Sequence, residues 1–187
     1  MPQQARLSQI EEIRAGAGDD IIDLTSQRFA YQCDNVAVFG GDGNDTIWAN
    51  SGTNILFGDA GDDRLVGSNG SDVLIGGSGN DRMHGGGGDD IFTFGGNWGN
   101  DTVEQLDGGT AILWFEEGSY ANWNADTLTY IDGDNSVEVS GISKDNIAVI
   151  FADAIGADTF ATFKNIGAFD DAASEKIFED KNSGMLA

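Results

Sequence analysis

The chain has 187 residues and is poor in several residue types: one cysteine, one proline, one histidine and nine lysines and arginines together. A single cysteine excludes a disulfide within the chain, and a single proline excludes collagen and a proline-rich linker. A single histidine excludes the HExxH pair of a metalloprotease, and no GxSxG nucleophile motif occurs. Cys33 and His84 could form a thiol–imidazole pair, but an inert thiol is the favoured interpretation. These absences predict a protein that is not an enzyme.

Apolar runs and positive charge are also scarce. No apolar stretch approaches the ~18 residues of a membrane-spanning helix, and the N-terminus does not have the apolar stretch of a secretory signal. The 32 acidic residues give a formal net charge of −23. Such a charge opposes nucleic-acid binding and docking on an anionic membrane, and it favours cations as partners. We expect no nucleic-acid partner, no membrane insertion and a mostly monomeric chain.

Glycine is abundant and unevenly spread: 18 of the 28 glycines lie between Gly40 and Gly99. Reading in blocks of nine from Gly40 gives six contiguous copies that end at Thr93. Position four is always glycine, and position six is aspartate or asparagine: Asp45, Asn54, Asp63, Asp72, Asp81 and Asp90. Position eight is always large and apolar: Ile47, Leu56, Leu65, Leu74, Met83 and Phe92. A seventh block (96–104) with Asp101 follows a two-residue slip, and an isolated copy (15–23) contains Asp20.

Each block combines a tight turn with a short strand. The glycine-rich six residues can turn because glycine accepts positive φ, and the last three are β-prone. Two blocks therefore make one coil of 18 residues, and successive coils stack about 4.8 Å apart as parallel strands. Because side chains alternate along a strand, position eight of both sheets points into a shared core. The pattern predicts an all-β fold, a parallel β-roll.

Stacking places the position-six acids of alternate blocks above one another on each edge of the roll. Neighbouring carboxylates repel unless a cation lies between them, and calcium accepts 6–8 carboxylate and carbonyl oxygens. The expected ion-binding pairs are Asp45–Asp63, Asp63–Asp81, Asn54–Asp72, Asp72–Asp90 and, less securely because of the slip, Asp81–Asp101. The position-five acids Asp62 and Asp89 are expected to face solvent rather than to bind the ion through their carboxylates.

The blocks resemble the RTX (repeats-in-toxin) nonapeptide GGxGxDxUx, where U is a large apolar residue. The resemblance covers residues 40–104 strongly and 15–23 weakly, and departs from the pattern where Asn54 replaces aspartate. It implies a right-handed roll that binds about four or five Ca2+ ions, in a bacterial protein secreted by the type I route. The implied metal-binding residues are the position-six residues, Asp20, and the turn residues Gly40, Asp42, Gly58, Ala60, Gly67, Asn69, Gly76, Ser78, Gly85 and Gly87.

The flanks are ordinary folded sequence. Strands are predicted over residues 21–24, 36–39, 111–115, 127–131, 136–140 and 147–151, with a hairpin turn at 132–135. Residues 25–35 are expected to form a loop or short helix, and the tail from Asp170 to Lys181 has helical spacing. The expected division is an N-terminal cap (1–39), the roll (40–104) and a C-terminal capping region (105–187) that could include a secretion signal.

Two functions from different classes remain. The first is a calcium-binding domain that folds on binding calcium outside the cell, as the C-terminal part of a larger secreted protein. The alternative is an adhesin-like module that binds a glycan or surface through exposed aromatics such as Trp48 and Trp98. One outer face of the roll, which includes Ile55, Phe57 and Ile75, is almost wholly apolar, so we expect the C-terminal region to cover it; a partner protein or self-association is the alternative.

Overall fold

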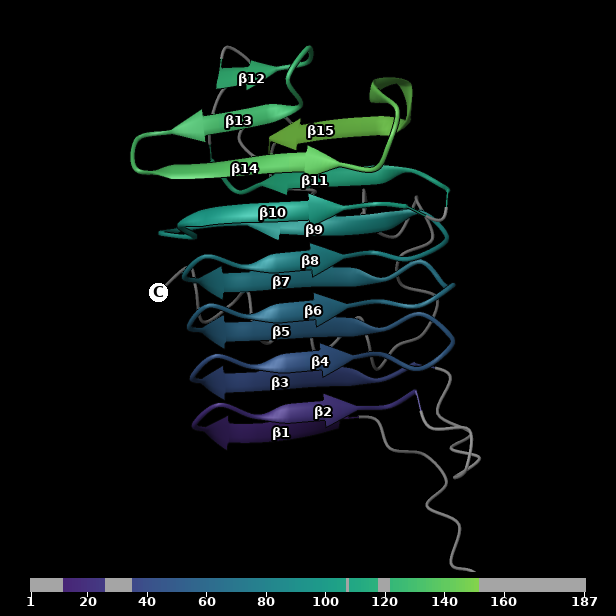
Figure 1. Cartoon of the computed structure of the whole chain (residues 1–187), viewed down its shortest axis with the longest axis vertical. Helices are drawn as coiled ribbons and strands as arrows, with labels where there is room; N and C mark the ends of the chain where they lie inside the picture. The colour runs from purple at the N-terminus through teal and green to yellow at the C-terminus, as the bar shows by residue number, and fades with distance from the viewer. Residues whose placement is uncertain (1–11, 26–34, 107, 118–121, 152–187) are drawn as a thin grey trace, which may run out of the picture.

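The computed structural model describes residues 12–25, 35–106, 108–117 and 122–151. The chain winds as a parallel β-solenoid whose two sheets face each other (Figure 1). The first sheet contains, in order, β1 (Glu12–Ala17), β3 (Ala37–Asp42), β5 (Ile55–Ala60), β7 (Val73–Ser78), β9 (Asp90–Phe94), β11 (Ala111–Phe115) and β15 (Ile147–Phe151). The second contains β2 (Ile21–Asp23), β4 (Thr46–Trp48), β6 (Arg64–Val66), β8 (Arg82–His84), β10 (Asn100–Glu104), β14 (Asn135–Ser140), β13 (Thr129–Asp132) and β12 (Trp123–Asn124).

Helical structure is almost absent from the described residues. One 3-10 turn, η2 (Lys144–Asn146), precedes β15. In this part of the chain there is no helix with the length and hydropathy needed to cross a membrane. The predicted C-terminal helix falls within residues 152–187, and the loop or short helix predicted over residues 25–35 falls largely within 26–34, so both predictions lie outside the described residues.

The nine-residue period sets the register of both sheets. Strand β4 pairs in parallel with β6, and β6 pairs with β8, so that Ile47 lies beside Leu65 and Leu65 beside Met83. Strands β3, β5, β7 and β9 pair in the same way on the other side of the core. The all-β, parallel roll predicted from the blocks is confirmed.

The core lies between the two sheets and is built from position eight of every block. These side chains are 0–1% exposed: Ile47, Leu56, Leu65, Leu74, Met83 and Phe92. Each coil adds two such side chains, and full burial of one contributes about 1.5–3 kcal/mol. Since the strands form the two sheets, the turns that join them lie along the two edges of the solenoid. These turns carry the acids.

The C-terminal strands continue the solenoid. Strands β11 and β15 extend the first sheet, β14 pairs in parallel with β10 in the second, and β13 pairs antiparallel with β14 through the predicted hairpin turn. Aromatic rings fill the core at this end: Phe115 stacks against Phe94 and Phe151, and Tyr130 is fully buried. Trp98 packs against the same rings and is only 5% exposed. The prediction that Trp98 is an exposed aromatic is therefore wrong.

The apolar outer face of the first sheet is covered. Its side chains form a second buried cluster with exposures of 0–6%: Ala37, Phe39, Ile55, Phe57, Val73, Ile91, Ile112 and Trp114. Phe39 and Phe57, on adjacent strands, stack with ring centroids 4.5 Å apart. The prediction that this face is not bare is confirmed. The tail expected to cover it lies beyond residue 151, outside the described residues.

Candidate metal sites

The turns bring the predicted acids together on two separate edges. The first edge, between a strand of the first sheet and the next strand of the second, carries Asp20, Asp45, Asp63, Asp81 and Asp101. The second edge, where the chain returns to the first sheet, carries Asn54, Asp72 and Asp90. Asp20 is half-buried, and the other seven side chains are 0–4% exposed. Seven polar or charged side chains are thus removed from water at the margins of an apolar core.

One oxygen of each acid on the first edge joins adjacent coils. The backbone N–H of each position-six residue donates to Oδ1 of the corresponding residue one coil later. The four hydrogen bonds run from Asp20 to Asp45 (2.8 Å), Asp45 to Asp63 (2.7 Å), Asp63 to Asp81 (2.8 Å) and Asp81 to Asp101 (2.8 Å). The last bond shows that the chain accommodates the two-residue slip before Gly96 without losing the register. Asp101 therefore belongs to the same row as the other four.

The other oxygen of the first-edge acids has no partner. Oδ2 of Asp45, Asp63, Asp81 and Asp101 is buried and accepts no hydrogen bond from the protein. Burying an ionised oxygen without a partner costs several kcal/mol, and the usual remedies are a proton or a cation. Four such oxygens on one edge therefore form the strongest candidate for a metal-binding row.

The glycine at position one leaves room beside three of the free oxygens, those of Asp45, Asp63 and Asp81. A Cβ on Gly58 would lie 2.2 Å from Oδ2 of Asp63 and 2.5 Å from the carbonyl oxygen of Gly76, in the next coil. A Cβ on Gly40 would lie 2.3 Å from Oδ2 of Asp45 and 2.8 Å from the carbonyl oxygen of Gly58. A carboxylate and a carbonyl oxygen thus face the same small space at successive levels. This is the mixed oxygen set that calcium takes.

Burial and mutual repulsion raise the pKa of the first-edge carboxyls. Burial, together with the carboxylates of Asp81 and Asp45, raises the pKa of Asp63 to about 7. The same causes raise the pKa of Asp101 to about 8, and burial raises that of Asp81 to about 6. The inter-coil hydrogen bond to Oδ1 opposes each shift by stabilising the ionised form. The pKa of Asp45 is also raised, mainly by burial. When these carboxyls are ionised, a positive charge beside them offsets the cost of burial.

Backbone carbonyls would have to supply most of the ligands. Nowhere in the described residues do three His, Cys, Asp or Glu side chains converge on one point. The position-three carbonyls predicted as ligands accept inter-coil hydrogen bonds, from Gly43 to Ala60 and from Gly61 to Ser78, at 2.8 Å each. A carbonyl has two lone pairs, so one remains for an ion. The first edge therefore offers one or two carboxylates and several carbonyls at each level.

The second edge brings the same residue types together but satisfies them differently. Oδ2 of Asp72 accepts hydrogen bonds from the backbone N–H of Ser68 at 2.6 Å and from its hydroxyl at 3.3 Å. Oδ2 of Asp90 accepts one from Nε2 of Gln105 at 2.7 Å. The predicted turn residues Gly67, Asn69, Gly85 and Gly87 lie on this edge. Gln105 follows the last block and matches no repeat position, so no sequence pattern pointed to its role.

A second row of hydrogen bonds was also missed from the sequence. Position-five side chains accept from backbone N–H groups one coil later: Asn44 from Asp62 at 2.7 Å, and Asp62 from Asn80 at 2.8 Å. Asp62 is exposed, as predicted. Its carboxylate nevertheless connects two coils, so the position has a structural role in addition to its place in the repeat.

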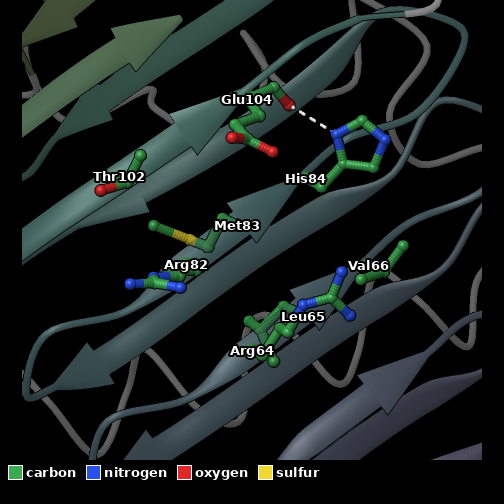
Figure 2. Close-up of a pocket in the computed structure, with 8 residues that line it drawn as sticks. All are labelled: Arg64, Leu65, Val66, Arg82, Met83, His84, Thr102 and Glu104. Atoms are coloured by element: carbon green, nitrogen blue, oxygen red, sulfur yellow. Dashed lines mark hydrogen bonds between the residues drawn. The ribbon is translucent and has the colours of Figure 1, made fainter.

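A cavity of about 350 Å³ lies on the outer face of the second sheet and is lined by residues of β6, β8 and β10, Glu104 among them. Figure 2 shows Arg64 and Arg82 on the adjoining strands β6 and β8, with His84 beside Glu104. Nδ1 of His84 lies 3.1 Å from the backbone carbonyl of Glu104. Among the described residues neither arginine forms an ion pair. The guanidinium of Arg64 lies 5.6 Å from the ring centroid of Trp48, within the range of a cation–π contact.

Comparison with known proteins identifies the repeats. The family model of the RTX calcium-binding nonapeptide repeat matches the chain in four copies, at residues 10–27, 37–65, 57–92 and 66–103. The copies cover both edges of the solenoid and include the coil of β1 and β2. No curated protein matches the chain.

Proposed function

Because residues 10–103 contain four copies of the RTX calcium-binding nonapeptide repeat, we propose that this chain binds calcium outside the cell and folds when it does so. RTX repeats are typical of secreted bacterial proteins, and their rolls typically act as structural calcium-binding domains. The observation that carries the proposal is the row of four buried, unpartnered Oδ2 atoms on the first edge. Three of them, in Asp45, Asp63 and Asp81, face a space that a side chain at Gly40, Gly58 or Gly76 would fill, so the residues present fit the ion.

The fold without calcium carries a large electrostatic penalty. The net charge is −23, and the first-edge carboxylates are stacked at the spacing of neighbouring strands. An acidic chain that cannot offset such repulsion stays disordered. Extracellular calcium modules bind at about 10⁻⁴–10⁻³ M, and each site contributes roughly 1.4 kcal/mol at a tenfold excess of free calcium. Four sites contribute about 6 kcal/mol, which is comparable to the whole stability of a domain.

This calcium dependence also suits export. A chain that stays unfolded at cytosolic calcium can pass through a narrow channel, and we propose type I secretion as part of a larger protein. We keep the division into an N-terminal cap (1–39), a roll (40–104) and a C-terminal capping region (105–187) as part of this proposal. The role assigned to the chain is structural, without catalysis.

Circular dichroism of the whole chain tests calcium-dependent folding. At neutral pH in chelator the spectrum should be that of a coil, and strand signal should appear as calcium is added. Magnesium at the same concentration is the control, because it demands six near-ideal ligands at shorter distances. A folded spectrum in chelator at neutral pH would contradict the proposal.

A second candidate function is supported by the cavity on the outer face of the second sheet. Its two arginines occupy paired positions on adjacent strands, and neither forms an ion pair with a described carboxylate, although Glu104 also lines the cavity. Half-buried Trp48 lies next to Arg64 and offers a ring face. We propose that this surface binds an acidic saccharide, with its carboxylate between the arginines. In the adhesin-like alternative, Trp48 is then the aromatic residue that contacts the ligand, and the ligand is an anionic glycan.

A further inference from the structure

The two edges of the roll have the same repeat, but the Oδ2 atoms of their aspartates differ in hydrogen bonding. On the first edge four carboxylate oxygens are free, whereas on the second edge the outer oxygens of both aspartates accept hydrogen bonds from the protein. The repeat itself does not distinguish the edges, because position six is Asp or Asn in every block. The difference arises from three side chains: Asn54 and Ser68, which depart from the repeat, and Gln105, which follows its last block.

Gln105 places an amide nitrogen among four oxygens. Nε2 lies 2.7 Å from Oδ2 of Asp90 and within 3.0–3.3 Å of the carbonyl oxygens of Gly86, Gly88 and Gly108. An amide nitrogen has two hydrogens, so more acceptors converge on it than it can satisfy at once. One carboxylate and several carbonyls around a single point are the surroundings that a calcium ion would have. In this structure the point is occupied by a side chain that is 1% exposed.

Asn54 lies one coil before Asp72 on the second edge and, like Gln105, places its amide nitrogen among oxygen atoms. Its Nδ2 donates to Oδ1 of Asp72 at 3.0 Å and to the carbonyl oxygens of Asn50 and Gly52 at 3.0 and 3.2 Å. An aspartate at this position would add a second negative charge beside Asp72. The amide instead supplies hydrogen where a cation would otherwise be needed. This accounts physically for the one departure from aspartate at position six.

Ser68 completes the second edge. It stands at position two of its block, where the repeat favours glycine, and both its N–H and its hydroxyl bond to Oδ2 of Asp72. We therefore infer that the protein's own N–H and O–H groups replace calcium along the second edge, so that the ions bind on the first edge only. This inference rests on the proposed calcium binding at the first edge, and it narrows the predicted ion count to the first-edge levels.

A matched pair of isosteric substitutions tests the inference. Asp81→Asn and Asp90→Asn each remove one charge from a buried position-six aspartate and keep an oxygen that can accept the inter-coil hydrogen bond. Equilibrium dialysis of the whole chain against calcium should give at least one ion fewer for Asp81→Asn. It should give an unchanged ion count for Asp90→Asn. Equal losses for the two variants would overturn the inference.

Gln105 provides an independent test that works in the opposite direction. Gln105→Glu replaces the amide with a carboxylate among the same oxygens, and we expect it to bind one calcium ion more than the wild type. Oε1 of Gln105 is buried and unpartnered, so the competing interpretation is that this oxygen is a calcium ligand. In that case Gln105→Ala would lose an ion and Gln105→Glu would gain none, and this result overturns the inference.

Calcium binding on the first edge and the replacement of calcium on the second edge can be refuted separately. If Asp81→Asn does not lower the ion count, calcium binding at the first edge is wrong. If Asp81→Asn lowers it and Asp90→Asn lowers it as much, first-edge binding stands and only the replacement of calcium on the second edge is refuted. Should Gln105→Glu fail to fold, Asn54→Asp is the second variant, with the same expected gain of one ion; no gain overturns the inference at that level.

Discussion

The backbone N–H of Asp63 donates a 2.8 Å hydrogen bond to Oδ1 of Asp81, the residue in the equivalent place one coil later. The other oxygen of Asp81 is buried and has no partner. One carboxyl group therefore serves two separate purposes: Oδ1 aligns the coils, and Oδ2 is left for a cation. Substitution by asparagine distinguishes these purposes, because it can retain the acceptor while it removes the charge.

Asp63→Asn should weaken calcium binding. The substitution removes a charge from the middle of the first-edge row and should lower the calcium-bound stability by about 1.4 kcal/mol for each site lost at tenfold excess calcium. Calorimetric titration and thermal unfolding in calcium measure both effects. Asp62→Asn is the matched control, because Asp62 is exposed and its amide replacement can still accept from Asn80. Equal losses for the two variants would show that buried position-six charge is not what binds the ion.

The calcium-free chain should be more stable in acid. Burial raises the pKa of Asp81 to about 6, of Asp63 to about 7 and of Asp101 to about 8 in the fold, from an ordinary value of 3.8. The fold therefore binds protons that the unfolded chain releases, and it is favoured at low pH. This contribution is fully present below about pH 4 and is lost as the pH rises through about 6–8. Circular dichroism in chelator across this range should show strand signal falling with pH; a rise would refute the assignment.

Gly58→Ala should impair the first edge even though the backbone of Gly58 requires no positive φ. The added Cβ would lie 2.2 Å from Oδ2 of Asp63 and 2.5 Å from the Gly76 carbonyl, in the space proposed for the ion. We expect reduced calcium binding and a lower melting temperature in calcium. Gly133→Ala is the control, because nothing lies within 4 Å of a Cβ there and the cost is backbone strain alone, about 1–2 kcal/mol. An ion count for Gly58→Ala equal to that of the control would exclude this space as the site.

The fold could be read from the sequence because its determinants are periodic. Apolar residues at position eight alternate with turn glycines at an invariant spacing from Ile47 to Phe92. This spacing is enough to predict the strands, the core and the register. The first-edge row could be predicted for the same reason. The continuation of the sheets through β11, β14 and β15 could not, because those residues do not repeat and their pairing depends on long-range packing.

The chemical difference between the edges could not be predicted either. It depends on where the amide of Gln105 and the hydroxyl of Ser68 reach in three dimensions. Gln105 follows the last block, and Ser68 replaces the position-two glycine, a substitution that does not by itself reveal the hydrogen bond it makes. The burial of Trp98 was missed for a related reason, since the turn position suggested exposure while the neighbouring rings of Phe94 and Phe115 enclose it.

Phe57→Ala tests the covered outer face of the first sheet. Phe57 is 3% exposed and stacks on Phe39, so its truncation should cost about 3–5 kcal/mol. Val66→Ala, at the same block position on the half-exposed opposite sheet, should cost less than about 1 kcal/mol. Chemical denaturation in saturating calcium measures both values. Similar small costs would show that the outer face of the first sheet is not packed in solution.

Arg64 and Arg82 provide the test of saccharide binding. Oligomers of a uronic acid should bind the calcium-loaded chain, and Arg64→Gln with Arg82→Gln should remove at least tenfold of the affinity. Arg14→Gln is the charge-matched control, since Arg14 lies on β1 and already pairs with Glu12. Isothermal titration at two salt concentrations measures the effect. Equal binding of a neutral oligosaccharide, or equal loss with the control variant, would refute a specific anion site.

The irregular residues of the roll also have a consequence for assembly. In a perfect repeat every contact recurs after one coil, so a chain could align its coils one step out of place at little cost. Here the coil containing Phe94 and Gly95 is longer, with a spacing of 20 residues from Asp81 to Asp101 where the two preceding coils have 18. Phe94 stacks on Phe115 with centroids 4.9 Å apart, and a one-step shift would separate them. The departures from the repeat thus specify one alignment among several that the repeats alone would allow.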